Sequence, residues 1–302
     1  MSTSTHAQAP GFQRFSIGGR TITALYDGFV PIFADDLHGA GAEEIAALLT
    51  GSFLPAEGDL HTAVTVFLVD LGSRTVLVDA GSGTSLGPDV GHVLTNLRAA
   101  GRRPEEIDDV LLTHLHPDHV HGLLRPDGGA AYPRARVHVA QADVRHWLDP
   151  AVAEAATDDV QKQIHEWARA ALAPYDAGGR LRTFEYGTEP VPGILAVDQH
   201  GHTPGHTGYL LGGGDEAVLF WGDTMHSHSV QLVRPEVSIA IDSDEGQAVR
   251  TRRDVLDRVV EQRCWVGAAH LPFPGIGRLR RGSGDYVWVP ASYRPLPPVA
   301  EG

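Results

Sequence analysis

The chain has 302 residues and a formal charge of −14, which argues against a nucleic-acid-binding protein because phosphate binding needs a clustered basic surface. No segment approaches the ~20 consecutive apolar residues that span a bilayer, and the first residues lack the pattern of a secretory signal. The single cysteine, Cys264, excludes an internal disulfide and a multi-cysteine zinc cluster, which fits a reducing compartment. Together, the charge, the hydropathy and the cysteine count lead us to expect a cytoplasmic protein without membrane or nucleic-acid partners.

The first part of the chain predicts mainly β-structure. Residues 14–32 have the β-branched and aromatic side chains of two strands, joined at a Gly18-Gly19 turn. Residues 63–79 repeat this pattern. An amphipathic helix is then predicted over 90–100, followed by a short buried strand at 110–112.

The second part adds a helical insertion and another set of strands. Apolar residues at loosely helical spacing predict one or two helices in 150–178, where they could form a lid over a pocket. Further along, apolar runs predict strands at 194–197, 209–211 and 218–221, then a helix at 245–260 and a last strand at 264–268. This order favours two stacked sheets with outer helices. We expect one domain over 1–302, with loose tails at 1–13 and 295–302.

The 17 histidines are concentrated in a few segments, of which the densest is THLHPDHVHG after the predicted strand at 110–112. In a strand-loop-helix turn, His114 and His116 can point to one side. Asp118 and His119 would begin the helix and face a second point, so that one segment can supply two metal sites. The alternative is a polar loop whose histidines cap a helix and contact solvent.

Distant segments carry complementary side chains. In QHGHTPGHTG, His202 is the predicted metal ligand, whereas His200 and His206 also fit a structural role in tying the loop to neighbouring backbone. Asp223 ends an apolar strand, where a carboxylate can bridge two cations, although a Gly-Asp pair there is also an ordinary turn. His270 follows the last predicted strand, which is neutral evidence by itself.

In this order the motifs H-x-H-x-D-H, GHTPGHT and WGDT and the late histidine resemble the metallo-β-lactamase superfamily. The segment VDAG at 78–81 is similar to an early motif of that superfamily, so the resemblance extends from about Phe15 to Trp288. GDTMHSH, RPEV and AHLPFPG are similar to the methyl parathion hydrolase and acyl-homoserine lactonase branch. The resemblance implies an α/β fold, an αββα sandwich of two stacked mixed β-sheets with outer helices. His121 departs from relatives, which commonly carry glycine there.

The resemblance also implies a dinuclear site. It assigns His114, His116 and His202 to the first cation, Asp118, His119 and His270 to the second, and Asp223 to a bridging position that holds a hydroxide. Asp118 is in addition a candidate proton carrier, and Asp79 is expected to orient a ligand histidine. Nitrogen and oxygen donors without thiolate suit Zn²⁺, the metal we expect, and also admit Mn²⁺, Fe²⁺ or Co²⁺. The roles of other histidines stay open: His121, His200, His206, His226 and His228.

Such a site implies hydrolysis, because paired cations ionise a water near pH 7 and polarise a carbonyl or phosphoryl oxygen. We expect a small neutral substrate, with a lactone or ester favoured over a phosphotriester. Trp147, Trp167 and Phe273 are the candidate pocket residues, although each also fits core packing. The alternative is a non-catalytic or regulatory protein that retained the metal site. Whether the chain forms a homodimer stays open.

Overall fold

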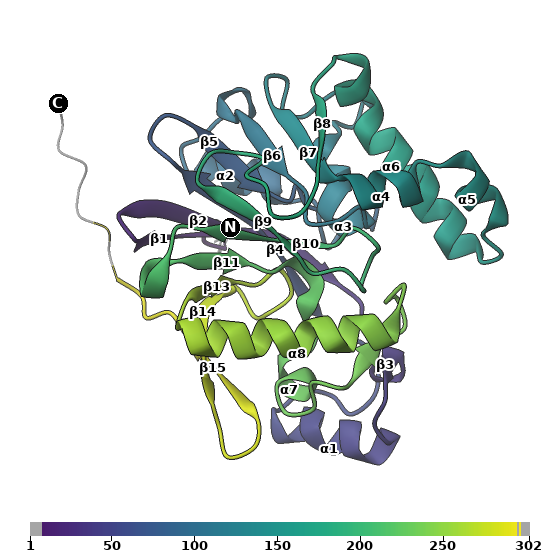
Figure 1. Cartoon of the computed structure of the whole chain (residues 1–302), viewed down its shortest axis with the longest axis vertical. Helices are drawn as coiled ribbons and strands as arrows, with labels where there is room; N and C mark the ends of the chain where they lie inside the picture. The colour runs from purple at the N-terminus through teal and green to yellow at the C-terminus, as the bar shows by residue number, and fades with distance from the viewer. Residues whose placement is uncertain (1–7, 295, 297–302) are drawn as a thin grey trace, which may run out of the picture.

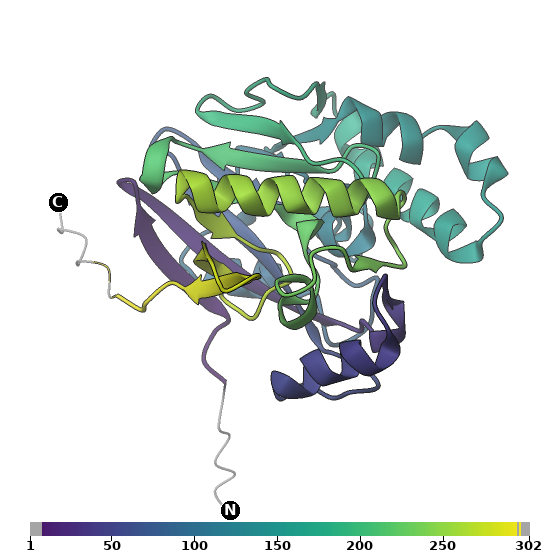
Figure 2. The ribbon, with the colours of Figure 1, turned by 60° about the horizontal axis from the view of Figure 1, so that its bottom comes forward.

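A computed structural model describes residues 8–294 and 296 of the chain. Two mixed β-sheets face each other and helices cover their outer surfaces, as Figures 1 and 2 show from two sides. This confirms the αββα sandwich expected from the sequence. Within the described residues, none of the helices combines the length and apolar character that a bilayer crossing requires.

The first sheet has seven strands, antiparallel at its N-terminal side and parallel from β5 to β8. Gly18 and Gly19 both have positive φ and form the tight turn between the first two strands, as predicted. In spatial order the strands are β1 (Phe12–Ile17), β2 (Arg20–Val30), β4 (Thr62–Asp70), β5 (Thr75–Val78), β6 (Asp109–Leu111), β7 (Arg136–Ala140) and β8 (Leu181–Phe184).

The second sheet has six strands, of which β11 and β13 run parallel. The strand predicted at 264–268 is present but is not the last, because a β14–β15 hairpin follows it. In spatial order the strands are β15 (Tyr286–Pro290), β14 (Ile276–Arg281), β13 (Trp265–Gly267), β11 (Val218–Phe220), β10 (Thr207–Leu211) and β9 (Ile194–Asp198). Two short strands, β3 (Leu37–His38) and β12 (Ser238–Ile239), pair separately.

The three predicted helical regions are confirmed as α2, as α5 with α6, and as α8, whereas α1 was not predicted. Of the predicted tail at 1–13, Phe12 and Gln13 belong to β1, because they pair with β2. The tail residues 1–7, 295 and 297–302 lie outside the described part of the chain. The helices are α1 (Ala42–Gly51), α2 (Val93–Ala99), α3 (Pro117–Val120), α4 (Gln141–Trp147), α5 (Pro150–Ala155), α6 (Asp159–Ala177), α7 (His228–Gln231) and α8 (Glu245–Gln262).

Strand β4 shows how the layers are held together. Val66 and Leu68 pack against the helices outside the first sheet, while Phe67 and Val69 pack between the two sheets. Successive side chains of a strand point to opposite faces, so a strand buried on both faces is apolar throughout its length.

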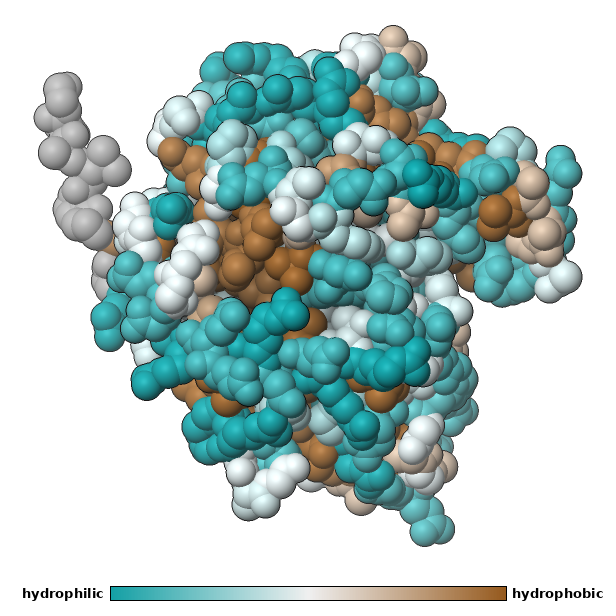
Figure 3. All heavy atoms as spheres, in the orientation of Figure 1, coloured by the Kyte–Doolittle hydropathy of each residue, from teal (hydrophilic) through white to brown (hydrophobic). Residues whose placement is uncertain are grey.

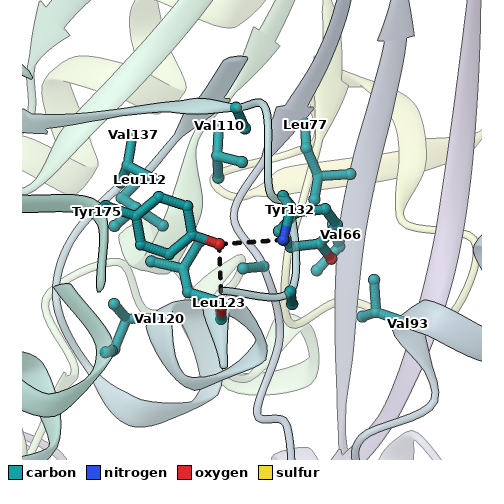
Figure 4. Packing of buried hydrophobic residues seen from close by; sticks show 14 of the residues in the cluster. Val66, Leu77, Val93, Val110, Leu112, Val120, Leu123, Tyr132, Val137 and Tyr175 are labelled. Carbon is teal, nitrogen blue, oxygen red and sulfur yellow. Dashed lines mark hydrogen bonds between the residues drawn. The ribbon is translucent and has the colours of Figure 1, made fainter. Parts of the chain in front are cut away.

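Helix α6 is attached to the first layer by a tyrosine as well as by apolar contacts (Figure 4). The Tyr175 hydroxyl accepts the N–H of Tyr132 at 3.1 Å and donates to the carbonyl of Leu123 at 3.0 Å. Leu123 belongs to a short 3₁₀ turn that continues directly from α3. The tyrosine therefore fixes α6 beside the segment that carries the histidine cluster.

Helix α8 covers only part of the outer face of the second sheet. A helix is about 10 Å wide, whereas six strands spaced ~4.8 Å apart extend over more than twice that width. The uncovered part forms an apolar groove of about 480 Å³ whose lining includes Leu195, Val197 and Leu210. Figure 3 shows an apolar area at this place, beside α8.

Candidate metal centre

Several strands bring polar side chains to one edge of the sandwich. His114 follows β6, Asp223 follows β11 and His270 follows β13, while His202 lies in the loop from β9 to β10. Because β11 and β13 are parallel, the loops after them leave the sheet at the same edge. In open α/β sheets, ligand-binding sites commonly lie at this edge, beyond the carboxyl ends of the strands.

The structure brings all seven predicted ligands together in two groups. In each group the donor atoms lie within 4.8 Å of one another, and Asp223 is common to both. One group is His114, His116, His202 and Asp223, and the other is Asp118, His119, Asp223 and His270. All are buried except Asp118, which is partly exposed. These are the same two sets that the sequence predicted.

Asp223 has the position that a bridging carboxylate requires. Its Oδ1 is 3.0 Å from Nε2 of His119. Its Oδ2 is 3.2 Å from Nε2 of His202 and 3.1 Å from Nε2 of His270. The carboxylate thus faces imidazoles of both groups.

The second ring nitrogen of three histidines has a partner outside the centre. Nδ1 of His119 is 2.9 Å from Asp79, and Nδ1 of His202 is 2.8 Å from Asp242. Nδ1 of His270 donates to the carbonyl of Ala63 at 2.8 Å. Such bonds fix the tautomer and aim Nε2 at the centre. Asp79 therefore lies where the sequence placed it, next to a predicted ligand.

The electrostatics favour the ligating protonation state at some of the donors and oppose it at others. Burial lowers the pKa of His114 and His116 well below the usual range, so both rings stay neutral. Burial alone would raise the pKa of Asp223, but the charges of neighbouring histidines outweigh it and lower this pKa. Burial would likewise lower the pKa of His202, but the carboxylates of Asp223 and Asp242 raise it to about 9. Neutral imidazoles and an ionised carboxylate are the forms that bind cations. His202 would therefore release a proton when a cation binds, as would His119 and His270, whose pKa neighbouring carboxylates also raise.

Two buried atoms support a fit between these residues and metal ions. Nε2 of His114 makes no hydrogen bond. Oδ1 of Asp223 makes none of acceptable geometry, although it lies 3.0 Å from Nε2 of His119, whereas nearly all buried polar atoms in proteins are hydrogen-bonded. Both belong to the donor groups. The donor set contains only nitrogen and oxygen, which suits Zn²⁺ and other first-row divalent ions.

The remaining histidines of the motifs have different surroundings. His206 accepts the backbone N–H of Asp223 at 2.9 Å and donates to the carbonyl of Gln199, so it ties the loop to the bridging residue. His200 is exposed and pairs with Asp198. Nε2 of His226 is 3.1 Å from Asp223, and its ring stacks on that of His270.

The two other histidines whose roles were open lie outside both donor groups. His121 packs against Trp167 with ring centroids 5.6 Å apart. His228 begins α7 and is partly exposed.

Sequence reasoning missed two buried carboxylates that contact the centre's loops. Asp242 bonds His202 directly, and Asp143 accepts the backbone N–H groups of Leu115 and Gly205. Neither lies in a histidine motif. A single aspartate near the start of a helix gives no signal of this contact, which depends on the tertiary fold.

A cavity of about 390 Å³ opens beside the centre and corrects part of the predicted pocket. Trp167 lines it, but Trp147 is buried behind His116, and Phe273 packs against Tyr26 beside a different cavity. Trp147 lies on the buried face of α4, which it shares with Asp143 one turn earlier. The lining consists of Val30, Pro31, Ile32, Leu86, His116, Pro117, Asp118, Val160, Ile164, Trp167, Asp223, His226, Ile241 and His270.

Known proteins share this fold and sequence pattern. A hydrolase of the beta lactamase superfamily, AbOPH, superposes with a TM-score of 0.91 at 35% identity, covering 96% of this chain and all of its own. AidC, a dizinc quorum-quenching lactonase in complex with a product, N-hexanoyl-L-homoserine, has the same fold at 23% identity, with a TM-score of 0.85 over 94% of this chain and 99% of its own.

Sequence comparison agrees with the structures. A probable metallo-hydrolase of Mycobacterium tuberculosis is 25% identical over 221 residues, which are 65% of this chain and 68% of the relative. A hydroxyacylglutathione hydrolase of Fuscovulum blasticum is 32% identical over half of this chain and 43% of its own length. The model of the Metallo-beta-lactamase superfamily matches residues 61–262, more than half of the chain. With the fold and both donor groups in agreement, the chain belongs to the metallo-beta-lactamase superfamily.

Proposed function

We propose that the protein is a dinuclear metal-dependent hydrolase of small neutral esters, with lactones as the favoured class. The observation that carries this proposal is the pair of donor groups that share Asp223 and open on an apolar cavity. Residues His114, His116 and His202 would hold one cation, Asp118, His119 and His270 the other, and Asp223 both. Zn²⁺ is the proposed metal, and Mn²⁺, Fe²⁺ and Co²⁺ fit the same donors.

When bound, the cations supply Lewis-acid polarisation and a water that ionises near neutral pH. The residues of the chain supply the contacts to the substrate and a group that can exchange protons. His116, Asp118 and Asp223 line the cavity, so the donor groups face a bound substrate directly. Asp118 is the most exposed of the seven donors, with 13% of its side chain accessible, which suits a group that exchanges protons with substrate or solvent.

The cavity wall supports a neutral substrate. Val160, Ile164 and Ile241 are among its apolar residues, and no lysine or arginine occurs among the described residues that line it. An apolar wall favours an acyl chain, and an anionic group placed against that wall, away from the metal centre, would be buried without a cationic partner. AidC, which has the same fold, is a lactonase, and this supports lactones as the favoured class.

The test is hydrolysis by the full chain loaded with Zn²⁺, assayed on a γ-lactone, a p-nitrophenyl ester and a nitrophenyl phosphotriester. We expect turnover of the lactone and the ester, loss of turnover with a chelator, and recovery with added Zn²⁺, Mn²⁺ or Co²⁺. Turnover of the phosphotriester would add a second substrate class at the same site. Full activity in metal-free protein would contradict the proposal, and two bound ions without any turnover would favour the non-catalytic alternative.

A further inference from the structure

A buried carboxylate lies between the two loops that carry the first group of histidines. Asp143 belongs to α4, which begins directly after β7, and its side chain is fully buried. It is not a member of either donor group. An ionised carboxylate is costly to bury unless it is hydrogen-bonded, so its hydrogen-bond partners indicate its role.

Each oxygen of this carboxylate accepts a hydrogen bond from a different loop. Oδ2 accepts the N–H of Leu115 at 3.1 Å, and Leu115 lies between His114 and His116. Oδ1 accepts the N–H of Gly205 at 2.6 Å, in the loop that carries His202. One side chain therefore joins the backbones of both loops.

The close approach of the second loop depends on a glycine. A Cβ at Gly205 would lie 2.3 Å from the backbone nitrogen of Asp143 and 2.8 Å from its Oδ1. The φ of Gly205 is not positive, so space rather than backbone conformation requires glycine here. The contact therefore requires both the carboxylate of Asp143 and the absence of a Cβ at Gly205.

The distance between the two loops matters for the donor atoms. Nδ1 of His116 and Nε2 of His202 lie 2.9 Å apart, each on one of the loops that Asp143 joins. Asp242 and Asp79 bond imidazole rings and so orient single donors. Within the described part of the chain, Asp143 hydrogen-bonds backbone N–H groups and no imidazole ring, so it positions loops rather than single rings.

We propose that Asp143 is a positioning residue that sets the distance between the two histidine loops and thereby the affinity of the His114, His116, His202 and Asp223 group for its cation. The proposal rests on the proposed function, since it concerns the same metal centre. It extends that function to a residue that touches neither metal nor substrate.

Asp143→Asn tests this with little change of volume. An amide has one acceptor oxygen, and its NH₂ would face the N–H of one loop, so at least one of the two bonds is lost. Loss of a residue that supports metal ligands lowers metal affinity by about 10–100-fold. We expect one of the two Co²⁺ binding steps to weaken by that factor while the other keeps its affinity. The measurement is a titration of metal-free protein with Co²⁺, followed by its visible absorption.

Two further variants make the test specific. Gly205→Ala keeps the carboxylate and displaces the loop, and we expect the same selective loss. Asp27→Asn is the matched control, because Asp27 is equally buried and accepts two backbone N–H groups, from Ser82 at 2.7 Å and Val93 at 3.1 Å. The segment between those residues holds no donor, so both binding steps should be kept.

The outcomes separate the two proposals. Two Co²⁺ ions bound as tightly by Asp143→Asn and Gly205→Ala as by the unchanged protein would overturn the inference and leave the proposed function intact. Equal weakening in Asp27→Asn would also overturn it, because the effect would then be general loss of stability. If the unchanged protein bound no Co²⁺, the proposed function would fail and the inference with it. Should Asp143→Asn not fold by circular dichroism, Gly205→Ala decides.

Discussion

Buried carboxylates in this protein are held by several donors each. Asp79 contacts His119 and Thr113, and Asp143 accepts two backbone N–H groups. Ionised carboxylates are costly to bury unless they are paired and hydrogen-bonded. The bonds that offset this cost also fix the direction of each partner. At the centre they therefore orient donors, and elsewhere they contribute to stability alone.

Asp109 is a buried carboxylate away from the centre, and its contribution to the stability of the fold depends on pH. It is fully buried at the start of β6 and accepts bonds from His138, Arg136 and Arg74. Burial alone would raise its pKa, but these bonds outweigh burial and lower it to about 2. An unfolded aspartate titrates near 3.9. Because the folded pKa is the lower one, Asp109 stabilises the protein above about pH 4, and this contribution is lost as pH falls towards 2.

We expect Asp109→Asn to lower the free energy of unfolding by about 2 kcal/mol at pH 7 and to have less effect near pH 2.5. Urea unfolding of the variant and of the unchanged protein, both metal-free and at several pH values, measures this, because the titrating groups of the centre contribute equally to both. Asp127→Asn is the control, since Asp127 pairs with Arg125 at the surface, where ion pairs contribute little. An unchanged pH dependence in Asp109→Asn would show that this carboxylate is not the group that titrates.

At the scale of elements, α6 joins the core to the cavity. Its Ala168 and Leu172 pack into the core between the first sheet and its outer helices, while Val160, Ile164 and Trp167 line the cavity. Spacings of three and four residues place this second set on one face of the helix. The predicted insertion thus contributes a wall next to the centre, and we propose that it acts as a lid that selects substrates.

Trp167→Ala tests the role of that wall. We expect KM for an ester with a long acyl chain to rise about tenfold and KM for its acetyl analogue to change little, because apolar contact area is lost only for the longer chain. Trp265→Ala serves as the control, since Trp265 begins β13 and lies at the opposite end of that strand from His270. Equal effects on both esters, together with a lower Tm, would assign Trp167 to the core instead.

Elements whose own residues largely determine their structure were predictable from the sequence. The Gly18-Gly19 turn, the apolar strands and the amphipathic α8 form where propensity and packing agree. Helix α1 packs only in a small satellite cluster, and β14 carries three arginines among its six residues, so neither has a strong pattern. Tertiary contacts decide such segments.

The residues of the site also divide into those that a local motif predicts and those that depend on tertiary contacts. Asp118 and His119 were predictable because they occur in one short motif with two histidines. Asp143 and Asp242 were not, because they meet the centre through contacts between distant segments. The pocket residues were the least predictable, since an aromatic side chain such as Trp147 fits a core as well as a pocket.

For the whole molecule, the sandwich places the centre where both sheets end. The loops after β6 and β11 come from different sheets, yet they meet because the sheets are packed face to face by one apolar layer. The net charge of −14 adds a long-range term that disfavours anionic substrates at low ionic strength. Fold and charge together agree with a centre that receives small neutral molecules.

The central claim is that two cations share Asp223. The most direct measurement is an anomalous difference map from crystals grown with Zn²⁺ and recorded at the zinc absorption edge. We predict two peaks roughly 3.5–4 Å apart, one contacted by His114, His116 and His202, the other by Asp118, His119 and His270, and both by Asp223. A single peak, or peaks that do not contact Asp223, would contradict the account.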